Sequence, residues 1–433
     1  MNLYSSFFRF LCGVVGEGAA LYSSGRGLLD KSWGSFLHER KADFLSRLSV
    51  SKNTTSHIWI HAASVGEVRG ILPLVRQIEK EYPDFPLLLT TTSVTGRATA
   101  AELFPDATVC LAPLDNSRYI VRFLDYFKPK VCIINETEIW PNMLIECSRT
   151  NVPVYIVNGR ISDSSWPRYR TFGFLFRPLL KLISKIYAQS TVDRDRFIYL
   201  GSSPKSVEVL GSTKYDSGSN SGESERKDNL QKFRNSISSL FLFSFGSVRE
   251  EEEEIVLDSV KRLLEEIPDV FVVIAPRHPR RFQPYTERFK LENIDYTLWS
   301  SAIGGELALG KGVRVMFLDT LGDLGYLYSL SDASFVGGTL APLGGHNILE
   351  PAEFSVPVIV GPYTVNVRPA EEALRNADAF LLARTSEEMV SEIKRLYLDP
   401  LHREKIEKGV RIAWENSIGT TSKLMERFRP VFN

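Results

Sequence analysis

The sequence predicts an α/β protein made of two doubly wound, Rossmann-like domains, each with a parallel sheet covered by helices. From residue 57 onward, short apolar runs alternate with helix-length amphipathic stretches. A polar stretch interrupts this alternation near residues 217–230, and the alternation then begins again. A chain of 433 residues is also too long for one ordinary core.

The strands are expected in short apolar runs bounded by polar or turn residues, each followed by a candidate helix. In the first half these runs are HIWIHAAS (57–64), PLLLTTTS (86–93), TVCLAPLD (108–115), KVCIINET (130–137), PVYIVNG (153–159) and KIYAQS (185–190). In the second half they are FLFSFGS (241–247), VFVVIAPRHP (270–279), VRVMFLD (313–319), ASFVGG (333–338), PVIVGP (357–362) and AFLLA (379–383).

The domain boundaries follow from the same pattern. We predict an N-terminal segment at 1–30, a first domain at 31–216, a linker at 217–232 and a second domain at 233–433. The last helix of the chain is expected to pack back on the first domain. Parallel sheets bind ligands at the carboxyl ends of their strands, so the two domains are expected to face a shared cleft.

Residues 3–22 have the pattern of a helix that lies on a membrane surface. Apolar side chains share one broad face of the helical wheel, while Arg9 and Glu17 lie on the other. The alternative is a helix that packs on the protein core. The charges make a full span of the bilayer unfavourable.

Composition and motifs exclude several functions. Lys plus Arg and Asp plus Glu both number 52, so no net positive charge favours nucleic acid as a partner. The four cysteines form no C-x-x-C pair, and we expect no metal site. The sequence contains no P-loop, no G-x-G-x-x-G and no G-x-S-x-G, which argues against an ATPase, a dehydrogenase and an α/β-hydrolase.

Three charged residues of the first half follow predicted strands or close the domain. Glu67 begins a helix, where it would either interact with the helix dipole or accept a proton from an attacking hydroxyl. Glu136, together with its neighbour Glu138, either caps the helix that begins at Pro141, or one of the two carboxylates orders an acceptor hydroxyl or a basic neighbour. Lys214 lies beside the linker, where it would either face solvent, as a lysine at a domain edge usually does, or meet negative charge that develops on a donor.

The second half contains candidate anion-binding loops. Gly246 and Ser247 lead into a helix, and Arg277 follows a strand beside prolines. The run Glu250–Glu254 is expected to be a solvated start of a helix. The turn at Gly344-Gly345 is a phosphate cradle in principle, and Glu350 would accept ribose hydroxyls.

Seven segments in this order resemble the 3-deoxy-D-manno-octulosonic acid (Kdo) transferases of lipopolysaccharide synthesis, from about residue 30 to the C-terminus. They are HAASVGE, ETEIWPN, GSTKYD, the GS-x-x-EE start, PRHP, DTLGDL and GGHNILEP. The resemblance implies a GT-B fold, a membrane-binding N-terminus and transfer of Kdo from CMP-Kdo to a lipid A precursor (lipid IVA), with inversion and without a metal or other cofactor. It implies an acceptor-binding first domain, a CMP-sugar-binding second domain and a place on the cytoplasmic side of the inner membrane.

The resemblance also implies roles for single residues. Glu67 would be the general base, and burial is expected to raise its pKa. Glu136 and Lys214 would stabilise the transition state. The positions that match the CMP-binding residues of the family are Pro276, Arg277, Leu321, Gly322, Asp323, Asn347, Ile348, Leu349 and Glu350. Relatives commonly have Glu where this chain has Asp323.

Two other functions are compatible with the sequence. Another sugar-nucleotide enzyme of the same fold, such as a UDP-sugar transferase or an epimerase, would bind UDP instead of CMP. A non-catalytic protein that binds the membrane surface would have retained the fold alone, and it is disfavoured because all the charged candidate residues are present.

Overall fold

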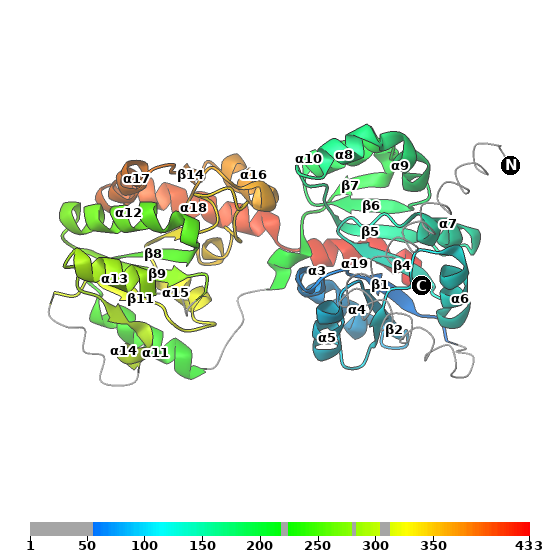
Figure 1. Cartoon of the computed structure of the whole chain (residues 1–433), viewed down its shortest axis with the longest axis horizontal. Helices are drawn as coiled ribbons and strands as arrows, with labels where there is room; N and C mark the ends of the chain where they lie inside the picture. Colours follow the sequence, from blue (N-terminus) through cyan, green and yellow to red (C-terminus); the bar gives the residue numbers. More distant parts are fainter. Residues whose placement is uncertain (1–54, 218–223, 279–282, 304–311) are drawn as a thin grey trace, which may run out of the picture. The chain divides into compact units, whose positions relative to one another are not determined.

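The computed structural model describes residues 55–217, 224–278, 283–303 and 312–433. The chain divides into two compact units, Met1–Ser217 with Gly419–Asn433, and Gly218–Ile418 (Figure 1). The helix predicted at residues 3–22 lies outside the described residues. In the described part of the chain, no helix has the length and apolar character needed to cross a bilayer.

The first unit contains a parallel sheet of seven strands in the order β3-β2-β1-β4-β5-β6-β7. The strands are β1 (Ile58–His61), β2 (Leu87–Thr91), β3 (Thr108–Leu111), β4 (Val131–Asn135), β5 (Val154–Gly159), β6 (Lys185–Ala188) and β7 (Val207–Val209). Six of them fall within the predicted apolar runs, whereas β7 was not predicted because only three residues of mixed polarity form it.

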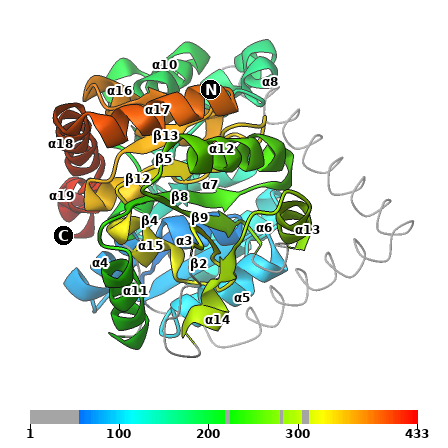
Figure 2. The same ribbon diagram turned by 90° about the vertical axis from the view of Figure 1, so that its left-hand side faces the viewer.

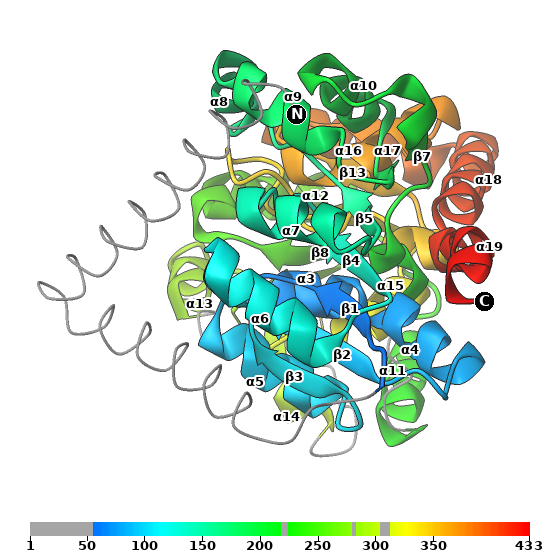
Figure 3. The same ribbon diagram turned by 90° about the vertical axis from the view of Figure 1, so that its right-hand side faces the viewer.

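Helices cover both faces of this sheet, because alternate side chains of each strand point to opposite faces. One face carries α6 (Ser117–Phe127), α7 (Pro141–Arg149), α9 (Gly173–Leu180) and α10 (Thr191–Leu200) (Figure 3). The other carries α3 (Val65–Gly70), α4 (Leu72–Glu81), α5 (Val94–Leu103) and the C-terminal α19 (Thr420–Phe432). The short α8 (Trp166–Thr171) precedes α9. The last helix thus contributes Leu424 and Phe428 to the core of the first unit.

The second unit contains another parallel sheet of seven strands, in the order β10-β11-β9-β8-β12-β13-β14. The strands are β8 (Phe241–Val248), β9 (Val270–Pro276), β10 (Thr297–Leu298), β11 (Val315–Phe317), β12 (Ala333–Val336), β13 (Val358–Val360) and β14 (Leu381–Leu382). The two-residue β10 was not predicted. The helices of the second unit are α11 (Ser224–Ser236), α12 (Glu253–Glu266), α13 (Gln283–Leu291), α14 (Trp299–Ile303), α15 (Leu324–Leu330), α16 (Arg368–Asn376), α17 (Ser386–Leu398) and α18 (Pro400–Ser417).

The prediction of a linker over residues 217–232 was wrong for its second part. Residues 224–236 form α11, which packs beside α15 (Figure 2). Leu230 and Phe233 lie three residues apart on one face of this helix and are buried in a core with Trp299. The helix was not predicted because most of its residues are polar and only these two positions are apolar and buried.

Candidate active site

The order of strands selects the loops that can form a ligand site. In the first sheet the direction of winding reverses between β1 and β4, which are hydrogen-bonded neighbours. In the second sheet it reverses between β8 and β12. In open parallel sheets, ligands bind outside the carboxyl ends of the strands at such reversals. Glu67, Glu136 and residues 347–350 follow three of these four strands, whereas Lys214, Arg277 and residues 321–323 follow β7, β9 and β11.

Glu67 lies in the first turn of α3, directly after the loop that follows β1. Its carboxylate accepts hydrogen bonds from the backbone N–H of Ala63, at 2.8 Å, and from the hydroxyl of Ser64, at 3.0 Å. Burial raises the pKa of Glu67 to about 7; the N–H of Ala63 opposes this shift, and the negative charge of Glu136 adds to it. The predicted rise in pKa is confirmed. A carboxyl with this pKa is suited to accept a proton at neutral pH.

Glu136 follows β4 immediately and has a left-handed backbone, with φ of 62°. A residue other than glycine in this conformation is uncommon and often marks a functional position. Its Oε1 lies 2.7 Å from Nζ of Lys214. Of the two interpretations open at this position, the ordering of a basic neighbour is thus the one found.

Lys214 reaches Glu136 from a distant part of the chain. It lies in the single-turn helix Thr213–Ser217, which follows the edge strand β7. Its side chain passes over Gly70, the last residue of α3, where a Cβ would lie 2.6 Å from Cε of Lys214. The absence of a side chain at Gly70 therefore makes room for the lysine.

A buried polar network connects the elements that carry these three residues. The Asn158 side chain donates to Oδ1 of Asn135 and to Oγ1 of Thr213, both at 2.7 Å, and accepts from the backbone N–H of Thr213. Asn135 donates to the backbone carbonyl of Glu67, and Thr213 donates to that of Gly70. Asn158 and Thr213 were not singled out from the sequence, because a lone amide or hydroxyl carries no local signal.

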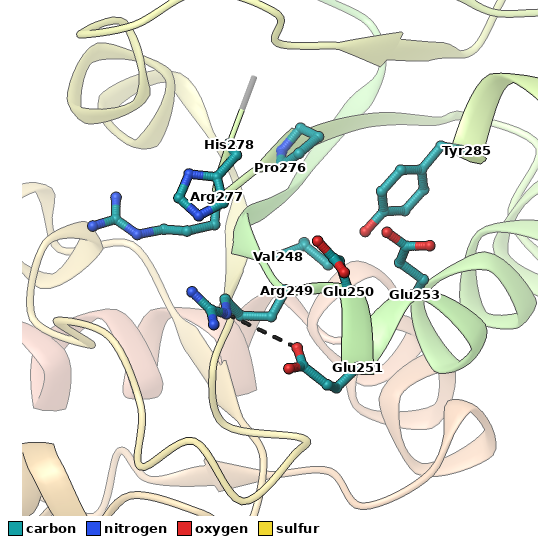
Figure 4. A pocket seen from close by; sticks show the side chains of 9 residues that line it. All are labelled: Val248, Arg249, Glu250, Glu251, Glu253, Pro276, Arg277, His278 and Tyr285. Atoms are coloured by element: carbon teal, nitrogen blue, oxygen red, sulfur yellow. Dashed lines mark ion pairs between the residues drawn. The ribbon is translucent and has the colours of Figure 1, made fainter. Parts of the chain in front are cut away.

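In the second unit, a cavity of about 250 Å³ lies beside the ends of β8 and β9. Its lining residues are Val248, Arg249, Glu250, Glu251, Glu253, Pro276, Arg277, His278 and Tyr285. Figure 4 shows the guanidinium groups of Arg249 and Arg277 toward one side, and Tyr285 with Glu253 toward the other. Pro276 and Arg277, two of the predicted CMP-binding residues, thus line a cavity that combines cations with carboxylates.

The segment Gly344–Glu350 contributes further polar groups near Arg277. Burial, together with the positive charges of Arg277 and Arg249, lowers the pKa of His346 to about 4, so its imidazole is neutral at pH 7. Desolvation raises the pKa of Glu350, whereas the positive charge of Arg277 lowers it. The charge of Arg277 thus acts on both His346 and Glu350.

Three of the predicted CMP-binding residues have side chains that are engaged within the protein. Ile348 and Leu349 are fully buried, so their side chains pack within the protein and are not exposed to a ligand. The buried Asp323 carboxylate accepts hydrogen bonds from the indole N–H of Trp299 and from the hydroxyl of Thr320. In contrast, Leu321 is 75% exposed and Gly322 has a left-handed backbone.

The interpretation of Glu250–Glu254 as a solvated helix start was wrong for Glu252. This residue is completely buried, and its carboxylate accepts four backbone N–H bonds. The turn at Gly344–Gly345 also differs from the expected phosphate cradle, because the N–H of Gly345 donates to the carbonyl of Gly338.

Among the described residues, no group of three or more His, Cys, Asp or Glu side chains is arranged to hold a metal ion.

Comparison with known proteins decides the family. A family model described as 3-deoxy-D-manno-octulosonic-acid transferase matches residues 38–217. The 3-deoxy-D-manno-octulosonic acid transferase of Haemophilus influenzae is 32% identical over 376 residues, which cover 86% of each chain. The chain belongs to the Kdo transferase family.

Members of this family are glycosyltransferases, and the fold agrees. A glycosyltransferase of Rickettsia africae has a TM-score of 0.60 at 14% identity, covering 88% of this chain and all of that one. The UDP-GlcNAc 2-epimerase of Neisseria meningitidis has a TM-score of 0.57 at 12% identity, covering 86% of this chain and 98% of that one. Both likenesses concern the fold alone. The predicted GT-B fold is thus confirmed for this Kdo transferase family member.

Proposed function

We propose that this Kdo transferase family member moves Kdo from CMP-Kdo to a lipid A precursor (lipid IVA), with inversion at the anomeric carbon and without a metal or other cofactor. The observation that carries the proposal is the Glu67 carboxyl, whose pKa of about 7 suits a general base. The negative charge of Glu136, which forms an ion pair with Lys214, adds to the rise in the pKa of Glu67.

The first unit would activate the acceptor. A sugar hydroxyl is only weakly acidic, so Glu67 takes its proton as the new C–O bond forms. In the same step the bond between the anomeric carbon and the CMP phosphate oxygen breaks, and CMP leaves with the electron pair. Attack from the face opposite to the leaving group inverts the anomeric centre. Lys214 and Glu136 would stabilise the charges of this transition state.

The second unit would bind the donor. Arg277 and Arg249 provide the fork-shaped cations that suit a phosphate, and they oppose the negative charge that CMP gains as it leaves. The other proposed contacts come from Pro276, from residues 321–323 and from residues 347–350. These cations supply positive charge of the kind that a metal ion supplies in other transferases.

A lipid acceptor requires the enzyme to work at a membrane surface. We therefore place the enzyme on the cytoplasmic side of the inner membrane, with residues 3–22 on the bilayer. Vesicle binding by the full chain, compared with a variant that lacks residues 3–22, tests this placement. Equal binding by both forms would contradict it.

The direct test is transfer from CMP-Kdo, generated in situ, to a tetraacyl lipid A precursor in detergent and EDTA, with the products weighed by mass spectrometry. We expect product with EDTA present, and the mass steps count the Kdo residues added. Glu67→Gln should lose most turnover and retain CMP binding. Glu102→Gln, an exposed substitution on α5, is the matched control.

Thermal protection separates this proposal from another sugar-nucleotide activity. CMP should raise the unfolding midpoint of the full chain, while UDP at the same concentration should not. Protection by UDP alone, together with no transfer from CMP-Kdo, would favour a UDP-sugar enzyme.

A further inference from the structure

Glu252 lies at the winding reversal of the second sheet and is completely buried. Its Oε2 accepts the backbone N–H groups of Arg249, at 2.9 Å, and Gly338, at 2.8 Å. Its Oε1 accepts those of Thr339, at 2.9 Å, and Leu340, at 2.8 Å. One carboxylate thus joins the loop after β8 to the loop after β12.

Hydrogen bonds extend this connection to the proposed donor-binding segment. The carbonyl of Gly338 accepts the N–H of Gly345 at 2.7 Å, and the carbonyl of Gly337 accepts the N–H of His346 at 3.2 Å. The two loops also pack closely, since a Cβ on Gly338 would lie 3.1 Å from Cδ2 of His346. The backbone that leads into Asn347–Glu350 therefore rests on the loop that Glu252 holds.

The Gly338–Leu340 loop resembles an anion-binding loop, but the anion that it binds is the Glu252 carboxylate of the protein itself. Three successive N–H groups, from Gly338 to Leu340, converge on one carboxylate. Burial of an ionised carboxylate is costly unless its oxygens accept hydrogen bonds, and here each oxygen accepts two. Because these N–H groups are occupied, the donor phosphate would bind to other groups, such as Arg249 and Arg277.

We infer that Glu252 is a positioning residue of the donor site. It orders Arg249 through the N–H of that residue, and it orders Asn347–Glu350 through the Gly337–Leu340 loop, without touching the donor itself. The inference rests on the proposed binding of CMP-Kdo by the second unit, and it adds a residue that the sequence had assigned to solvent.

The test is Glu252→Gln in the full chain. The amide keeps the size of the side chain, but its NH₂ group cannot accept hydrogen bonds, so two backbone N–H groups lose their partner. We expect the dissociation constant for CMP and the KM for CMP-Kdo to rise by about tenfold or more, with a smaller change in kcat. Hydrogen–deuterium exchange should become faster in a peptide that covers residues 337–350.

Glu254→Gln is the matched control, because Glu254 lies two residues away and its side chain is 85% exposed. This variant should keep the CMP affinity and the exchange rates of the wild type. A folded Glu252→Gln variant with wild-type exchange in residues 337–350 and wild-type CMP affinity would overturn the inference.

The exchange measurement separates this inference from the proposed function. A wild-type chain that does not bind CMP would refute the proposed donor, whereas the exchange comparison without ligand still decides whether Glu252 orders the segment. Where Glu252→Gln does not fold, exchange in the wild type decides the question. The amides of Gly338, Thr339 and Leu340 should be strongly protected, and fast exchange at these amides would overturn the inference.

Discussion

Gly70→Ala is expected to separate turnover from stability. Gly70 is the last residue of α3, and a Cβ at this position would lie 2.6 Å from Cε and 3.0 Å from Cγ of Lys214. Contacts this short do not persist, so the flexible lysine side chain must move away. Its Nζ then leaves Oε1 of Glu136, which lies 2.7 Å away in the wild type.

The effect on stability should be small, because two changes oppose each other. Alanine is favoured over glycine within a helix by about 0.5–1 kcal/mol. The lost ion pair is partly exposed, with 41% of the Lys214 side chain accessible, and such pairs contribute about 0.2–1 kcal/mol. We therefore expect the free energy of unfolding to stay within about 1 kcal/mol of the wild type.

The effect on turnover should be much larger. Removal of one group that stabilises developing charge typically lowers kcat by about 100- to 1000-fold. A displaced lysine retains part of this effect, so we expect kcat to fall by about 10- to 100-fold. CMP affinity should not change, because the proposed CMP-binding residues belong to the other unit.

The assay compares Gly70→Ala, Lys214→Ala and the double variant in Kdo transfer, with denaturant unfolding alongside. If both substitutions act through the same lysine, the double variant should be no slower than Lys214→Ala alone. Gly173→Ala is the control, since the nearest atom to its added Cβ is Cδ2 of Leu200, at an ordinary 3.5 Å. Wild-type kcat in a folded Gly70→Ala variant would refute the reasoning.

Five further outcomes are expected. The kcat/KM of transfer should rise with pH to half its maximum near 7, because Glu67 must lose its proton; a profile without this step would exclude it as the base. Folding raises the pKa of Glu67 from 4.5 to about 7. The contribution of Glu67 to the free energy of unfolding is therefore complete below pH 4.5 and is lost as the pH rises through 7. Denaturant unfolding of the wild type and of Glu67→Gln at several pH values would measure this loss. Asn158→Ala leaves buried partners unsatisfied and should cost about 1–3 kcal/mol by denaturant unfolding. Phe233→Ala should destabilise the second unit by about 3–5 kcal/mol, whereas an unchanged transition would mean that α11 is not part of its core. Arg277→Ala should raise the dissociation constant for CMP about tenfold, and an unchanged value would remove it from the donor site.

The sequence by itself determined the two sheets and the position of most candidate residues. Strands that are buried on both faces appear as short apolar runs, and this signal is local. The residues after such runs lie at the carboxyl ends of strands whatever the rest of the fold does. Glu67, Glu136 and Arg277 could therefore be singled out before their neighbours were known. Short edge strands such as β7 and β10 carry too few residues for this signal.

Only the tertiary structure decided how these residues are held. Thr213 donates a hydrogen bond to the carbonyl of Gly70 across 143 positions of the chain. The same contact between distant segments brings the side chain of Lys214 over Gly70. Glu252 is surrounded by glutamates in the sequence, yet its partners Gly338, Thr339 and Leu340 lie 86 to 88 positions away. A run of glutamates in the sequence predicts side chains exposed to solvent, because a buried charge is costly. Here the cost is offset by hydrogen-bond donors that the fold brings from a distant segment. Burial and long-range hydrogen bonding are properties of the folded chain, so no local pattern reveals them.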